Sequence, residues 1–136
     1  MKKFNTLLIL GSFLIFGVII STGCKKKAAD PIVPAFTVTA VPVTFQTGEA
    51  GLQFFGKCNN DDVKMTKAII QDPLSQQTTT FNLNGNYFIK NEAFDMLATN
   101  TGYVKELGTW SFTFSGNRTA DGTAFNVGAT LNVSGK

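Results

Sequence analysis

The chain has 136 residues, no histidine and a formal net charge of +3. Its basic residues gather near the N-terminus. From residue 36 onward seven basic side chains accompany eight acidic ones, so a nucleic-acid partner, which needs a clustered basic face, is not expected. The lack of histidine excludes Ser-His-Asp and Cys-His nucleophile systems and the common zinc ligand sets, so we expect a protein that is not an enzyme and holds no metal or cofactor.

The first residues have the pattern of an export signal. Lys2 and Lys3 precede an uncharged, apolar stretch from residue 4 to residue 23, which is typical of a secretory signal peptide. A stretch of this length, about 20 residues, also suffices to cross a bilayer, so a signal anchor is the alternative. Small residues directly before Cys24 and three lysines directly after it favour cleavage.

The letters STGC at residues 21 to 24 resemble the lipobox of bacterial lipoproteins, with Ser21 where the family usually has Leu. The resemblance implies that residues 1–23 are removed and that Cys24 carries acyl chains such as palmitate. Each buried methylene contributes about 0.8 kcal/mol, so two or three chains anchor a protein firmly to a membrane. In the family an Asp after the cysteine retains the protein at the inner membrane. Lys25 stands there instead, so we expect the outer membrane and favour a periplasm-facing domain over a surface-exposed one.

A short tether and one domain follow the signal. Residues 24–35 contain three lysines and two prolines, which favour extended backbone. Residues 36–136 number about 100, enough for one domain with a single core.

Three strands are predicted between residues 36 and 71. The first, FTVTAVPVTFQ, contains Pro42, which fits an edge strand or a kink. The turn TGEAG leads to a second strand, whose apolar face comprises Leu52, Phe54, Gly56 and Cys58. The third, DVKMTKAII, keeps its alternation only if a bulge lies near Thr66 or Lys67.

The stretch TTTFNLNGNYFIK predicts a β-hairpin. Asn84-Gly85 between two β-prone runs is the preferred two-residue turn, because both positions need positive φ. This register would pair Leu83 with Asn86, Asn82 with Tyr87 and Phe81 with Phe88. Phe81, Leu83 and Phe88 would face the core, and Tyr87 would be exposed beside Asn82.

The last third of the chain contains one ambiguous segment and two clear strands. The spacing of Phe94, Leu97 and Ala98 is compatible with one or two turns of helix. Two alternating runs follow, GTWSFTFSG and FNVGATLNV, with a loop at Asp121-Gly122 between them. The inward residues of the first run are Trp110, Phe112 and Phe114.

The stretch from Gly108 to Val133 resembles the last hairpin of immunoglobulin-like sandwiches found in bacterial envelope proteins, with Trp110 at the aromatic position of the G-T-aromatic start. DVKMTKAIIQDP is similar to a third strand of such domains. The Cys…Trp…Cys spacing of antibody domains is absent. The expected fold is all-β, an immunoglobulin-like antiparallel sandwich of about seven strands over residues 36–136.

The candidate binding residues are aromatic rings accompanied by amides, which suit sugar recognition. One grouping is Tyr87 with Asn82, Asn84 and Asn86, and a second is Tyr103 with Asn100. Ordinary turn and strand preferences explain the same residues and are the favoured alternative. Asp61 and Asp62 in CNNDD are interpreted as a turn rather than a calcium loop, and Cys58 as a buried small hydrophobe rather than a reactive thiol.

The sequence therefore predicts a lipid-anchored envelope protein that acts as a non-catalytic binding or scaffolding module. An envelope protein is favoured over a glycan as the partner. The alternatives are a carbohydrate-binding accessory lipoprotein and, less favoured, a hydrolase that uses carboxylates alone.

Overall fold

The computed structural model describes residues 30–96 and 102–135. Within these ranges, the chain from Ile32 onward forms one compact unit. The predicted signal peptide and Cys24 lie outside the described residues. Within the described ranges, no helix is long and apolar enough to cross a membrane.

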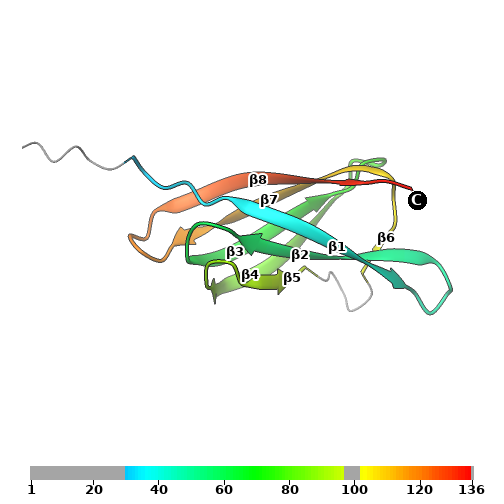
Figure 1. Cartoon of the computed structure of the whole chain (residues 1–136), viewed down its shortest axis with the longest axis horizontal. Helices are drawn as coiled ribbons and strands as arrows, with labels where there is room; N and C mark the ends of the chain where they lie inside the picture. The colour runs from blue at the N-terminus through cyan, green and yellow to red at the C-terminus, as the bar shows by residue number, and fades with distance from the viewer. Residues whose placement is uncertain (1–29, 97–101, 136) are drawn as a thin grey trace, which may run out of the picture. The chain divides into compact units, whose positions relative to one another are not determined.

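The domain contains two antiparallel sheets (Figure 1). The first has the order β1-β2-β5 with β6 also paired to β2, and its strands are β1 (Phe36–Thr44), β2 (Ala50–Cys58), β5 (Ala93–Asp95) and β6 (Tyr103–Val104). The second has the order β4-β3-β7-β8, and its strands are β3 (Val63–Gln71), β4 (Thr78–Phe88), β7 (Gly108–Arg118) and β8 (Ala124–Val133). The predicted all-β antiparallel sandwich is confirmed, with eight strands among the described residues.

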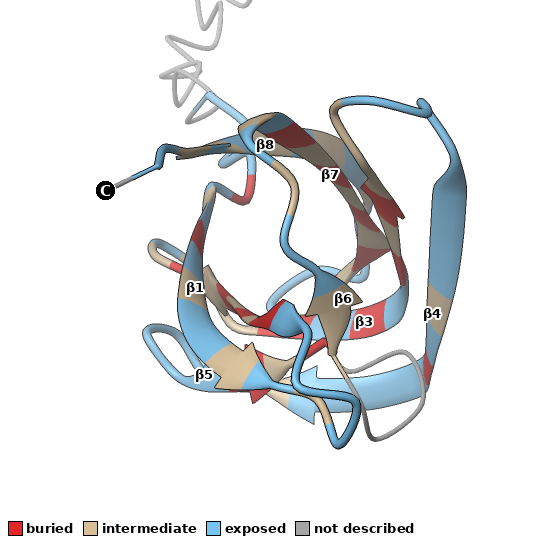
Figure 2. Cartoon of the chain, turned by 90° about the vertical axis from the view of Figure 1, so that its right-hand side faces the viewer, coloured by how far each residue is buried: buried red, intermediate tan, exposed pale blue. Residues whose placement is uncertain are grey.

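The core lies between the sheets, because each strand turns alternate side chains inward (Figure 2). Trp110, Phe112 and Phe114 on β7 are buried as predicted, and Phe54 on β2 meets them from the other sheet. Full burial of a large apolar side chain contributes about 1.5–3 kcal/mol. The inward residues of β8 are only half-buried, since β8 is an edge strand.

The first three strands follow the prediction closely. β1 and β2 form a hairpin in continuous register, and β1 with Pro42 is an edge strand. Cys58 is a buried free thiol within the core cluster. The register of β3 shifts between Met65 and Lys67, where the bulge was predicted.

The predicted hairpin at Asn84-Gly85 is wrong. Both residues do have positive φ, 51° and 76°, but they lie in a bulge inside one continuous strand. β4 pairs with β3 on both sides of the bulge, so Asn86 lies opposite Met65 and Asn82 opposite Lys67. Some bulges have residues at positive φ, as this type of turn does, and the continued pairing of β4 with β3 shows that a bulge is formed here.

The side-chain directions predicted for β4 are nevertheless observed, although β4 pairs with β3 and does not fold back on itself. Leu83 is buried, and Phe81 and Phe88 pack against the core. Tyr87 is 48% exposed, as predicted, but it lies opposite Lys64 and not Asn82.

The predicted helical turn is also wrong at Phe94, which lies in β5 opposite Gly56. The ring of Phe94 covers the space that a side chain at Gly56 would need, since a Cβ there would come within 2.6 Å of the ring. Tertiary packing on β2 therefore overrides the local helical spacing. Leu97 and Ala98 lie outside the described residues.

Candidate functional site

The polar side chains gather at the two ends of the sandwich, and the ends differ. One end comprises the loops at residues 59–62, 89–92 and 119–123, and we call it the Arg118 end, because the guanidinium of Arg118 contacts two of these loops. Arg118 is buried and forms ion pairs with Asp61 and Asp121. The hydrogen bond to Asp61 and the charges of both carboxylates raise the pKa of Arg118. The guanidinium therefore ties the β2–β3 loop to the β7–β8 hairpin.

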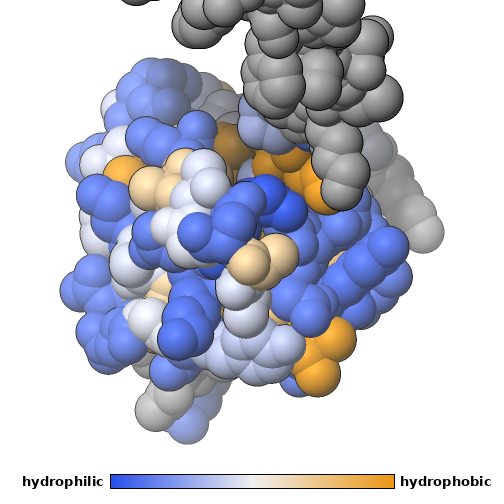
Figure 3. All heavy atoms as spheres, turned by 90° about the vertical axis from the view of Figure 1, so that its left-hand side faces the viewer, coloured by the Kyte–Doolittle hydropathy of each residue, from blue (hydrophilic) through white to orange (hydrophobic). Residues whose placement is uncertain are grey.

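The neighbouring polar groups at the Arg118 end are also satisfied within the protein. Asp62 accepts hydrogen bonds from the backbone N–H of Lys90 at 2.7 Å and from the hydroxyl of Tyr87 at 3.1 Å. The bond to Asp62 raises the pKa of Tyr87. The surface of this end is mainly hydrophilic, with a few separate apolar spots (Figure 3). The Asp61-Asp62 pair thus serves the loop structure, as the turn interpretation predicted.

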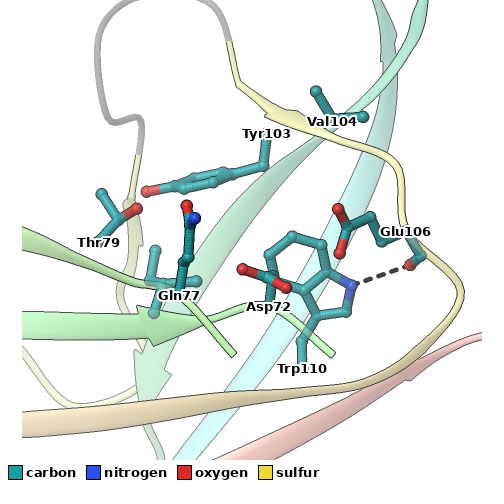
Figure 4. Close-up of a pocket in the computed structure, with 8 residues that line it drawn as sticks. Asp72, Gln77, Thr79, Tyr103, Val104, Glu106 and Trp110 are labelled. Atoms are coloured by element: carbon teal, nitrogen blue, oxygen red, sulfur yellow. Dashed lines mark hydrogen bonds between the residues drawn. The ribbon is translucent and has the colours of Figure 1, made fainter. Parts of the chain in front are cut away.

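The opposite end of the sandwich contains a pocket of about 140 Å³, and we call it the pocket end. Its walls come from the end of β3, the β3–β4 loop, the start of β4, β6 and β7. The lining residues are Ile70, Asp72, Gln77, Thr79, Tyr103, Val104, Glu106 and Trp110. Figure 4 shows the carboxyl groups of Asp72 and Glu106 close to the Trp110 ring and the amide of Gln77 directed toward the ring of Tyr103.

Asp72 is held by the turn that follows β3. Its Oδ1 accepts hydrogen bonds from the backbone N–H groups of Leu74 and Ser75, and its Oδ2 accepts one from the Ser75 hydroxyl. These bonds, chiefly the one from the Ser75 side chain, lower the pKa of Asp72. Asp72 is therefore a fixed negative charge at the pocket wall.

Glu106 lies beside Asp72, but no comparable set of hydrogen bonds holds its carboxyl group. Its backbone carbonyl accepts a hydrogen bond from the Trp110 indole N–H at 3.0 Å, which fixes the segment over the ring. Its Oε2 is buried and has no hydrogen-bond partner among the described residues. Burial, followed by the charge of Asp72 and a hydrogen bond with it, raises the pKa of Glu106.

Tyr103 forms the aromatic wall of the pocket. Its ring packs against Phe54 and Trp110, with centroids 5.3 and 6.1 Å away. Its hydroxyl is buried and has no partner among the described residues. Burial, with a smaller effect of the Asp95 charge, raises the pKa of Tyr103 to about 12, so the phenol is neutral and can both donate and accept.

The structure separates the residues predicted as ligand-binding. Tyr87 lies opposite Lys64 near the start of β3, whereas Tyr103 lies in the pocket beside residues that follow the end of β3. Asn82, Asn84 and Asn86 lie along β4, none of them in the pocket lining, and Asn100 is outside the described residues. Of the two predicted groupings, only Tyr103 lines this pocket.

Sequence reasoning missed the other polar residues of the pocket. Asp72 and Glu106 are 34 positions apart, and no local pattern connects them. One signal was available, because Asp72 is followed by Pro73 and Ser75, a turn sequence that fixes its carboxylate. Within residues 30–96 and 102–135, no three His, Cys, Asp or Glu side chains lie close enough together to hold a metal ion.

Comparisons of this chain with protein families, with curated proteins and with solved structures found no match.

Proposed function

We propose that this protein is a lipid-anchored, non-catalytic binding module of the bacterial cell envelope that holds its ligand in the pocket at the pocket end. One observation carries the proposal: Glu106 Oε2 and the Tyr103 hydroxyl are buried in the pocket wall without a partner among the described residues. Leaving a buried polar group without a hydrogen bond costs about 1–3 kcal/mol. A ligand that pairs with both groups recovers that cost.

The domain type that we propose is the immunoglobulin-like sandwich. The order β1-β2-β5 corresponds to strands A, B and E of that fold, and β4-β3-β7-β8 corresponds to C′, C, F and G. The fold by itself carries no activity, so the function rests on the pocket.

The described chain enters the domain at the end opposite the pocket. Asn60 at the Arg118 end holds the incoming chain, because its side chain hydrogen-bonds to Ala35 N at 2.9 Å and to Val33 O at 2.8 Å. β7 runs from the pocket end to Arg118 over 11 residues, which at roughly 3.3 Å each gives a span of about 35 Å.

The contact between Asp72 and Glu106 supports binding over hydrolysis. Glycosidases separate their two carboxyl groups by about 5 Å or more, so that the glycosidic oxygen or a water fits between them. Here the charge of Asp72 acts directly on Glu106, and Asp72 already accepts three hydrogen bonds from its own turn. The chain also has no histidine to act as a base at neutral pH.

A protein partner fits the surroundings of the pocket better than a glycan. Three large apolar side chains next to the pocket are exposed, namely Leu74 (70%), Val104 (47%) and Leu107 (53%). Neighbouring exposed apolar side chains mark surfaces that another protein covers.

The binding proposal can be tested with the full lipoprotein in detergent micelles. Trp110 is the only tryptophan and lines the pocket, so its fluorescence reports occupancy. We would titrate the protein with purified envelope proteins and glycans, and repeat every titration with Tyr103→Ala. A saturable fluorescence change that the substitution abolishes is expected. If every binder has the same affinity for the Tyr103→Ala variant, the pocket is not the binding site.

The anchor needs a separate test. Replacement of Cys24 by Ala should abolish incorporation of a labelled fatty acid and release the protein from the membrane fraction. If the Cys24→Ala variant is processed and fractionates like the wild type, the lipoprotein proposal is wrong.

A further inference from the structure

We propose that the pocket binds an alkylammonium group, supplied by a lysine side chain of the protein partner. This inference rests on the proposed binding function and names the chemical group that the pocket accepts.

The charge of the pocket favours a cation. Its lining includes the carboxyl groups of Asp72 and Glu106 and no basic side chain. Asp95 adds a further acidic group near Tyr103, and one of its two oxygens already accepts a hydrogen bond from Gln53 at 2.7 Å. Lys105, the adjacent basic residue, is exposed and does not line the pocket. The charge of the lining therefore repels an anionic ligand.

The pocket also offers acceptors that match an ammonium group. An ammonium donates three hydrogen bonds and accepts none. Glu106 Oε2 is free to accept one of them, since it has no partner among the described residues, whereas the Tyr103 hydroxyl points toward Thr79 and away from the carboxyl groups (Figure 4). The fixed carboxylate of Asp72 supplies negative charge beside Glu106.

The size and the aromatic lining suit an aliphatic stem. A water molecule occupies about 30 Å³ in the liquid, so a pocket of about 140 Å³ holds roughly five atoms of that size. Four methylenes and one nitrogen, the outer part of a lysine side chain, have that number. The rings of Tyr103 and Trp110 provide an apolar surface for the stem and π-faces that attract the cation.

An amino sugar has the same cationic group and is the alternative source. The exposed apolar residues beside the pocket, Leu74, Val104 and Leu107, favour the lysine of a protein, since a sugar ring would leave them uncovered. These two segments are in contact, because a Cβ at Gly108 would lie 2.9 Å from the Pro73 side chain. The rim is thus one surface that a protein partner can cover.

Binding of the cation should expel a proton. The pKa of Glu106 is raised by burial and by Asp72, the charged group that faces it, so near that pKa the carboxyl is partly protonated. An ammonium between the two carboxyl groups replaces this proton, which passes to the buffer. Affinity should therefore rise as the pH rises through the pKa of Glu106 and level off above it.

The test uses the full lipoprotein in micelles and the fluorescence of Trp110. The probes are N-acetyl-lysine methylamide, N-acetyl-norleucine methylamide, which has the stem without the charge, and glucosamine. We expect the lysine probe to bind about 10- to 100-fold more tightly than the norleucine probe, the ratio that a charged hydrogen bond provides. Glu106→Gln should remove this preference together with its pH dependence, while Glu92→Gln at the Arg118 end should retain both.

The results of these titrations distinguish three claims: the binding function, the ammonium group and its source in a protein. Equal binding of the lysine and norleucine probes, or an unchanged preference in Glu106→Gln, would overturn the inference. Tighter binding of glucosamine than of the lysine probe would overturn the protein source. If envelope ligands change the Trp110 fluorescence but no amine does, the binding function stands and the ammonium inference falls. If nothing changes it, both fall.

Discussion

The two ends of the sandwich use similar residues for opposite purposes. At the Arg118 end, acidic groups are matched by a guanidinium, a phenol and backbone N–H groups. At the pocket end, Glu106 faces another carboxyl, and the Tyr103 hydroxyl has no partner among the described residues. Satisfied buried polar groups stabilise a fold, whereas unsatisfied ones cost stability and mark a place where another molecule can complete the set. The predictions below perturb one end at a time.

The largest loss of stability is expected for a substitution at Phe54, beneath the pocket. Phe54 is fully buried and supports both Tyr103 and Trp110, with ring centroids 5.3 and 4.8 Å away. Phe54→Ala should lower the free energy of unfolding by about 3–5 kcal/mol, because it removes a large buried ring and leaves a cavity. Urea unfolding followed by Trp110 fluorescence measures this loss. A loss below about 1 kcal/mol would mean that Phe54 does not support the pocket end.

A smaller loss of stability is expected for a substitution of Arg118. The pH dependence of this loss shows whether the ion pairs cause it. Arg118→Met removes both ion pairs but keeps the aliphatic stem, so the urea midpoint should fall at neutral pH. Hydrogen bonds from Thr123, and to a lesser extent the charge of Arg118, lower the pKa of Asp121. A carboxylate with a lowered folded pKa contributes stability above the ordinary Asp value, about 3.9, and loses it as the pH falls through the folded value.

The difference in urea midpoint between wild type and Arg118→Met should therefore be largest above about pH 4 and shrink at lower pH. An equal difference at pH 7 and pH 2.5 would show that Arg118 acts through packing alone. Ligand binding at the pocket end should be unchanged at pH 7.

Replacement of either tyrosine by Phe is expected to give the smallest change in stability. The two substitutions should differ clearly in their effect on ligand binding. Tyr103→Phe removes an unpartnered hydroxyl, so it should weaken ligand binding without loss of stability. Tyr87→Phe removes the bond to Asp62 at the other end, so it should leave binding unchanged. Paired Trp110 titrations measure both. Equal effects of the two substitutions on binding would contradict the division between the ends.

Much of the fold could be predicted because its strands alternate cleanly. β2, β7 and β8 alternate apolar and polar residues along much of their length, and the bulge in β3 appeared as a break in such an alternation. The hairpin predicted at Asn84-Gly85 was wrong because positive φ occurs in bulges as well as in turns. The helical turn predicted at Phe94 was wrong because Phe94 packs on Gly56, which lies on a strand distant in sequence.

The pocket could not be predicted for a different physical reason. It joins Asp72, held by its own turn, with Tyr103, Glu106 and Trp110, and only the pairing of β3 with β7 and of β6 with β2 brings these segments together. The exposed Tyr87 and the asparagines of β4 looked equally suitable in sequence. Burial and missing partners distinguish the two sets, and both are properties of the folded chain.

The role assigned to Glu106 is tested most directly by measuring unfolding and ligand binding together in Glu106→Gln across pH. The raised folded pKa of Glu106 means that its ionised form destabilises the folded protein, so wild-type stability should fall as the pH rises from about 4.3 through the raised value. The Glu106→Gln variant should lack this decline, be at least as stable as the wild type at pH 8, and lose binding of the lysine probe. A variant that is clearly less stable at pH 8 and still binds the probe would show that Glu106 belongs to the fold and that the pocket end is not a binding site.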